Sequence, residues 1–176
     1  MSTTKWVLDP THSEAGFKVK HLMFTNVSGQ FTKFEATASS HDENFDNATF
    51  DFTAEVDSIN TNNADRDGHL KSGDFFDAAQ FPTITFKSTS VSRESEDDLK
   101  VTGDLTVHGV TKSVTLDVEF GGIQKDPWGN IKSGFSVTGK INRKDFGLTW
   151  NAALETGGVM LGEEVKLNLE LQFVKQ

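Results

Sequence analysis

The stretch NNADRDGHLKSGDFFDAAQFP, residues 62–82, concentrates side chains that could carry out chemistry. Asp65 and His69 are four positions apart, so on a helix they would share one face, with Asp67 nearby. Carboxylates and imidazoles bind zinc, but such a site needs a third or fourth ligand. The histidines at 12, 21 and 108 have no spacing that would supply one. We predict no metal ligands, and a metal-dependent enzyme using the 65–69 cluster stays as an alternative.

Covalent hydrolysis has less support in the sequence. Ser13 and Ser72 lie near histidines along the chain, but nearness in sequence says nothing about the geometry of a catalytic triad. The glycine-rich loop at 155–164 has neither the phosphate-binding nor the dinucleotide-binding spacing. We therefore predict no catalytic residue, no cofactor and no enzymatic activity.

The same stretch also fits a structural or ligand-binding role. Arg66 lies between Asp65 and Asp67, which favours a local ion-pair cluster that fixes a helix in place. A buried arginine could instead hold an anionic headgroup through paired hydrogen bonds. Arg66, Asp67 and His69 are thus predicted as a headgroup-binding or structural polar cluster. Phe75 and Phe76, on a short helical turn, would close the mouth of a barrel if the strands form one.

Helix signals are confined to this stretch. Asn62 or Asn63 can cap the helix, and Gly73 suits its end. Elsewhere apolar residues alternate with polar ones, which predicts half-buried strands. Eight are expected, with the helical insertion between the third and fourth: 14–21, 29–39, 48–57, 83–91, 99–107, 113–122, 133–143 and 164–175.

Two irregularities accompany this pattern. Phe31 is out of step with Phe34, so we expect a bulge near Thr32 and Lys33, and a short extra strand is possible at residues 5–8. Eight antiparallel strands form either a sandwich or a closed barrel, and the pattern alone does not choose between them. Small inward residues indicate either close packing or a tunnel.

Composition narrows the function further. The 176 residues suit one domain, 1–176, and carry a formal charge of −9, which disfavours nucleic acid and polybasic membrane docking. The chain contains no cysteine, and 15 Phe without any Tyr favour a dry interior. No leader or membrane-spanning run is visible, so the sequence as written predicts a cytoplasmic protein without membrane insertion; a periplasmic one is expected only if a leader was removed.

Four stretches resemble the YceI-like family of bacterial proteins: LDPTHSEAGFKVKHL (8–22), residues 62–86, VTGDLTVHGVTKSVTL (101–116) and NRKDFGL (142–148). The resemblance covers nearly the whole chain. It implies an all-β, eight-stranded, lipocalin-like antiparallel barrel that binds a polyisoprenoid or similar amphiphilic lipid.

On this basis we predict a non-enzymatic protein that transports or sequesters an isoprenoid-type or other long-chain amphiphile in the barrel lumen. A filled barrel acting as an interaction module is a further alternative, and a homodimer is possible. The expected ligand contacts are apolar: Phe17, Val19, Phe34, Phe50, Phe52, Phe75, Phe76, Phe86, Leu105, Val137 and Leu169.

Overall fold

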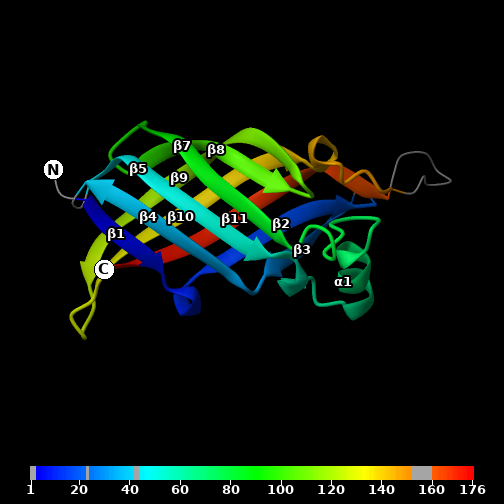
Figure 1. The fold of residues 1–176 in the computed structure, drawn as a ribbon, viewed down its shortest axis with the longest axis horizontal. Coiled ribbons are helices and arrows are strands. Elements are labelled where there is room, and N and C mark those ends of the chain that lie inside the picture. Colours follow the sequence, from blue (N-terminus) through cyan, green and yellow to red (C-terminus); the bar gives the residue numbers. More distant parts are fainter. Residues whose placement is uncertain (1–2, 23, 42–43, 152–159) are drawn as a thin grey trace.

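The computed structural model describes residues 3–22, 24–41, 44–151 and 160–176. In these ranges no helix is both long enough and apolar enough to cross a bilayer. Figure 1 shows a sheet that curls around one axis, with helix α1 at one end. The strands and the α-helix are β1 Thr3–Leu8, β2 Glu14–His21, β3 Thr25–Phe31, β4 Phe34–His41, β5 Asn44–Glu55, β6 Ile59–Asn60, α1 Ala64–Lys71, β7 Thr83–Arg93, β8 Asp98–Val107, β9 Val110–Lys125, β10 Ile131–Asn142 and β11 Leu161–Lys175.

The sheet closes on itself. Neighbouring strands pair antiparallel in the order β1-β4-β5-β7-β8-β9-β10-β11, and β1 pairs again with β11 through Trp6–Lys175 and Leu8–Phe173. This ring is the eight-stranded antiparallel barrel that the sequence predicted as one of two architectures. Closure leaves the ring without a free edge, since the last strand pairs with the first.

The first three strands of the barrel are each built from two pieces. A short 3-10 turn at Pro10–His12 separates β1 from β2, and another at Val56–Ser58 separates β5 from β6. β3 ends at Phe31 and β4 begins at Phe34, so the irregularity predicted at Thr32 and Lys33 is present as a break between two strands and not as a bulge within one strand. The pieces nearer to α1 are β2, β3 and β6. They continue the wall beyond the ring, because β2 pairs with β11, β3 with β2, and β6 with β3.

The helix occupies the predicted position, before β7 and after the third composite strand. Its N-cap is Asn63, whose side-chain oxygen accepts a hydrogen bond from Arg66 N at 3.0 Å. Asp65 and Asp67 lie in the first turn, where the helix dipole favours negative charge. The helix ends with Ser72 as its C-cap, directly before Gly73.

Aromatic rings fill the barrel end that lies away from α1. Phe45 is 1% exposed, and its ring centroid lies 5.4 Å from Trp6, 5.2 Å from Phe120 and 5.0 Å from Phe135. The buried indole of Trp6 donates to Ser40 Oγ at 2.9 Å, so its N–H is satisfied. This packing gives the barrel one solid end.

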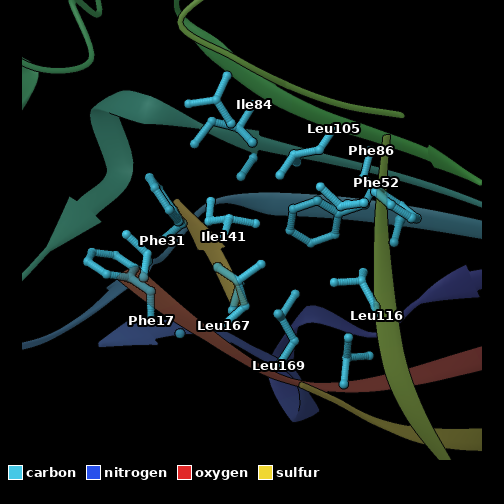
Figure 2. Close-up of a pocket in the computed structure, with 18 of the residues that line it drawn as sticks. Phe17, Phe31, Phe52, Ile84, Phe86, Leu105, Leu116, Ile141, Leu167 and Leu169 are labelled. Atoms are coloured by element: carbon cyan, nitrogen blue, oxygen red, sulfur yellow. The ribbon is translucent and has the colours of Figure 1, made fainter. Parts of the chain in front are cut away.

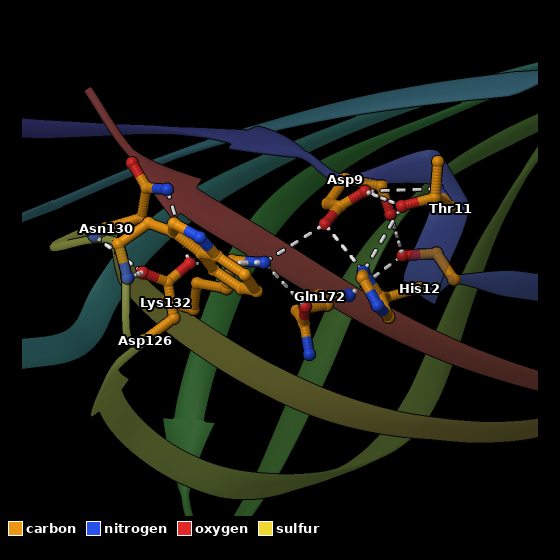
Figure 3. Close-up of polar contacts among 9 residues, drawn as sticks. Asp9, Thr11, His12, Asp126, Asn130, Lys132 and Gln172 are labelled. Carbon is orange, nitrogen blue, oxygen red and sulfur yellow. Dashed lines mark hydrogen bonds and ion pairs between the residues drawn. The ribbon is translucent and has the colours of Figure 1, made fainter.

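A polar network on the outside fastens the same end (Figure 3). Lys132 Nζ on β10 lies 3.2 Å from Asp9 Oδ2 and 3.7 Å from Asp126 Oδ2, and it donates to Gln172 Oε1 at 3.3 Å. Hydrogen bonds from Thr11 and then from His12 and Lys132 lower the pKa of Asp9 well below its usual range, against the opposing effect of burial. The network joins the 3-10 turn after β1 to β10 and β11.

Candidate functional site: an apolar cavity inside the barrel

The barrel encloses a cavity of about 210 Å³. Strands on all sides contribute side chains to its wall, and Figure 2 shows Phe17, Phe52 and Leu169, from β2, β5 and β11, pointing into one interior. For scale, an apolar cavity of about 150 Å³ stays dry and binds benzene, whereas pockets for drug-sized ligands are about 300–1,000 Å³. The space suits a thin apolar chain better than a bulky ring system.

The predicted lining residues lie around this cavity with one exception. Those that line it are Phe17, Val19, Phe50, Phe52, Phe75, Phe76, Phe86, Leu105, Val137 and Leu169. Phe34 is not in the wall: it is half-buried, and its ring stacks on Phe52 with centroids 5.8 Å apart. It therefore packs beside a lining residue on the same face of the sheet. Whether any of these side chains contacts a ligand stays a prediction.

Large side chains occupy much of the room that small inward residues leave. A Cβ atom on Gly103 would lie 2.5 Å from Phe86 Cζ, and one on Gly139 would lie 2.6 Å from Leu116 Cδ2. At these two positions the small residue permits close packing. Ala36 and Ala54, by contrast, face the cavity itself. Small inward residues therefore permit close packing at some positions and leave open space at others.

The α1 end of the cavity is covered by the helix and the turn after it. Leu70, Phe75 and Phe76 line the space, and Phe75 is 5% exposed. The Phe76 ring lies edge-on to Phe31 at 6.2 Å, and the Phe75 ring lies 5.3 Å from Trp150. This geometry fits the predicted plug, because two adjacent rings close the interior where the wall is made of short pieces.

The polar cluster at 66–69 braces this cover. Arg66 donates from Nε to Thr61 Oγ1 at 2.8 Å and from Nη2 to Thr61 O at 2.7 Å. Asp67 Oδ1 accepts from Thr61 N at 2.9 Å and from the Thr61 hydroxyl. Both side chains thus hold the same buried threonine, and neither Arg66 nor Asp67 lines the cavity. The predicted partners of Arg66, its flanking aspartates, are replaced by Thr61.

His69 lies at the outer side of the cover. Its Nε2 is 2.9 Å from Asp74 Oδ2, and its ring is edge-on to Phe75 and Trp150 at 5.1 and 4.8 Å. Within the described ranges no three His, Cys, Asp or Glu side chains gather in a way that could hold a metal ion. The spacing of Asp65 and His69 is thus not accompanied by further ligands there.

Arg143 is a buried cation in the cavity wall that was not predicted from the sequence. This residue is 3% exposed and begins the 3-10 turn Arg143–Phe146 after β10. Its guanidinium donates to four backbone carbonyl oxygens: Gly162 at 2.8 Å, Leu148 at 2.6 Å, Trp150 at 2.9 Å and Leu161 at 3.4 Å. Burial lowers its pKa, and Glu163 partly counters that effect.

This arrangement places a positive charge against apolar space. Among the described residues, the guanidinium has no carboxylate within ion-pairing distance, and Glu163, the acid that acts on it through its charge, is paired with Lys144 Nζ at 2.9 Å. Carbonyl dipoles satisfy hydrogen bonds but do not cancel the charge. A polar group with negative charge would therefore be favoured at this end of the cavity, and a cation would be disfavoured.

Comparisons with known proteins agree with the architecture. The YceI-like domain family matches residues 6–173. A UPF0312 protein of Staphylococcus aureus is 44% identical over 171 residues, covering 97% of both chains. The solved structure of a Campylobacter jejuni YceI protein is 34% identical, with a TM-score of 0.76 over 89% of this chain and 90% of that one. A structure described as a polyisoprenoid binding domain from Saccharophagus degradans shares the fold at 16% identity, with a TM-score of 0.67 over 97% and 98%. By sequence and by fold, the chain belongs to the YceI-like family.

Proposed function

We propose that the protein binds one extended apolar chain, of an isoprenoid-type or other long-chain amphiphile, inside the barrel, and that it carries or sequesters this molecule without chemical change. The observation that carries the proposal is the cavity of about 210 Å³ with its almost wholly apolar wall. Family membership supports it, as does the fold shared with a protein described as a polyisoprenoid binding domain.

Burial of hydrocarbon provides enough free energy for such binding. Each methylene transferred from water contributes about 0.8 kcal/mol, so ten carbons contribute roughly 8 kcal/mol before ordering costs are subtracted. A long chain exceeds the space that is vacant now, so its uptake requires side chains in the wall to move. Phe75 and Phe76 are suited to this, because they cover the α1 end from a turn and not from a strand.

The polar end of the amphiphile is proposed to face Arg143. Hydrocarbon would extend towards the aromatic rings at the opposite end, where Phe50, Phe135 and Phe173 contribute to the wall. Arg66 and His69 were the residues expected near a headgroup; their contacts with Thr61 and Asp74 favour a bracing role for them.

Native mass spectrometry of gently purified protein tests the proposal. We expect co-purifying lipid, or uptake of one prenyl alcohol by protein stripped of lipid. A prenyl carboxylic acid should bind more tightly than the amine of the same chain, because of Arg143. The absence of both co-purifying lipid and uptake of any prenyl chain would contradict the proposal; equal binding of acid and amine would contradict only the orientation.

A further inference from the structure

The outer face of β2, β11 and β10 carries a row of lysines. Lys18 on β2 lies directly opposite Lys166 on β11, which lies directly opposite Lys140 on β10. Lys20 follows two positions after Lys18 on the same side of β2, and all four side chains are exposed. We define these four residues as the lysine row. They face outward because Phe17 and Val19, which alternate with them, line the cavity.

This placement is unfavourable for the isolated fold. Residues directly opposite in antiparallel strands are close neighbours, and like charges there are destabilising. Among the described residues, Lys140 is the single member of the row with an ion-pair partner, Glu164 at 3.6 Å. Local rules that a fold breaks without compensation are expected at functional surfaces.

An exposed aromatic residue lies at the α1 end of the row. Phe24, in the turn that joins β2 to β3, is 83% exposed. The turn lies near the cover of the cavity. Leu161, which pairs with His21, exchanges hydrogen bonds with Asn151, and the neighbouring Trp150 contacts His69 and Phe75. Lys20, which pairs with Asn26 two positions after Phe24, is the nearest lysine of the row. Lysines together with an exposed apolar ring are residue types that interfacial membrane-binding helices also use.

One group of acidic residues lies at the opposite end of the molecule from the row. Glu94, Glu96, Asp97 and Asp98 belong to the hairpin between β7 and β8, which Figure 1 shows at the end away from α1. β7 has 11 residues and spans about 35 Å, several times the screening length of about 8 Å at physiological salt. The charge of this hairpin thus acts weakly on the lysine row. Other acidic residues lie nearer to it: Glu163 and Glu164 on β11, and Asp65, Asp74 and Asp77 in and after α1.

We propose that the lysine row and Phe24 dock the protein on the surface of a membrane that contains anionic lipids, with the covered end of the cavity beside the bilayer. Positive charge complements the headgroups, and Phe24 enters the interface. The acidic hairpin points away, because the same surface repels it. The docking surface is separate from the cavity, so it does not depend on the proposed ligand.

Vesicle co-sedimentation of the full chain tests the docking. We expect binding to an equal mixture of phosphatidylglycerol and phosphatidylcholine at low salt, loss of binding at high salt, and little binding to phosphatidylcholine alone. Each lysine near an anionic surface contributes about a fivefold change in partitioning, so the triple variant Lys18→Gln, Lys20→Gln, Lys166→Gln should bind roughly 100-fold more weakly. Phe24→Ser should weaken binding without changing its salt dependence.

A matched control has the same net charge as the triple variant. Lys5→Gln, Lys87→Gln, Lys125→Gln removes three exposed lysines elsewhere and should change binding less than fivefold. The row variant should unfold at no lower temperature than the wild type, since it removes like-charge repulsion, and it should still take up a prenyl alcohol. Equal binding to both vesicle types, an equal loss in the control, or equally tight binding to duplex DNA would overturn the proposal.

Discussion

The first prediction tests whether the barrel interior is vacant, with the matched substitutions Ala36→Leu and Ala38→Leu. Both alanines are on β4 and are almost equally buried, at 5% and 4% exposure. Ala36 lines the cavity, whereas Ala38 does not and is paired with Trp6 in the register of β1 and β4. The same three added carbon atoms therefore enter empty space in one variant and filled space in the other.

The expected changes in stability have opposite signs. In the cavity, three buried carbons contribute roughly 2 kcal/mol, which for a chain of this size raises the melting temperature by about 4–8 °C. At Ala38 the added volume overpacks the core and costs about 1–3 kcal/mol. Ala36→Leu should also weaken uptake of a prenyl alcohol by roughly tenfold or more, because the added carbons take the place of ligand methylenes.

Thermal unfolding followed by circular dichroism measures the first effect, and titration with the alcohol measures the second. Both need protein stripped of lipid, because a co-purified ligand would stabilise the wild type and obscure the comparison. Equal destabilisation by Ala36→Leu and Ala38→Leu would refute the reasoning, since it would mean that the interior near Ala36 is as filled as the core.

Three further predictions concern packing and charge. Gly103→Ala should lower the unfolding free energy by about 1–3 kcal/mol, because its Cβ would lie 2.5 Å from Phe86 Cζ; Gly68→Ala, in α1 with nothing within 4 Å, should raise it by roughly 0.5–1 kcal/mol in the same denaturant titration. Arg143→Met should cost about 3 kcal/mol in urea unfolding, since backbone carbonyls lose their donors, and an unchanged midpoint would contradict the buried network. The folded state lowers the pKa of Asp9 from 3.8, so the contribution of Asp9 to the unfolding free energy is present above that pH and is lost as the pH falls further. Asp9→Asn should therefore flatten the acid side of a curve of stability against pH. An acid side identical to that of the wild type would contradict this prediction.

Local sequence patterns were sufficient to predict most of the barrel. Strict alternation located the strands because each wall has one face towards the core and one towards water. The choice between barrel and sandwich depends on the pairing of β1 with β11, residues at opposite ends of the chain, which no local pattern reports. The break at Thr32 and Lys33 was visible in the sequence because Phe31 and Phe34 are out of step.

The predicted site was less complete for reasons that are also physical. Phe34 shares its alternation with Ala36, but at the first position of β4 its ring stacks on Phe52 and does not reach the cavity wall. Arg143 was missed because its burial depends on carbonyls of Leu148, Trp150 and Gly162. One signal was available: Arg143 continues the inward alternation of Phe135, Val137 and Ile141, a position where a charged residue is unexpected.

Nuclear magnetic resonance with methyl-labelled leucine and valine tests the central claim most directly. A bound prenyl alcohol should give intermolecular Overhauser contacts to the methyl groups of Leu105, Val137 and Leu169, which line the cavity, and none to Val7, which is 42% exposed. Contacts confined to outward-facing methyls such as those of Val7, with the interior resonances unchanged, would contradict binding inside the barrel.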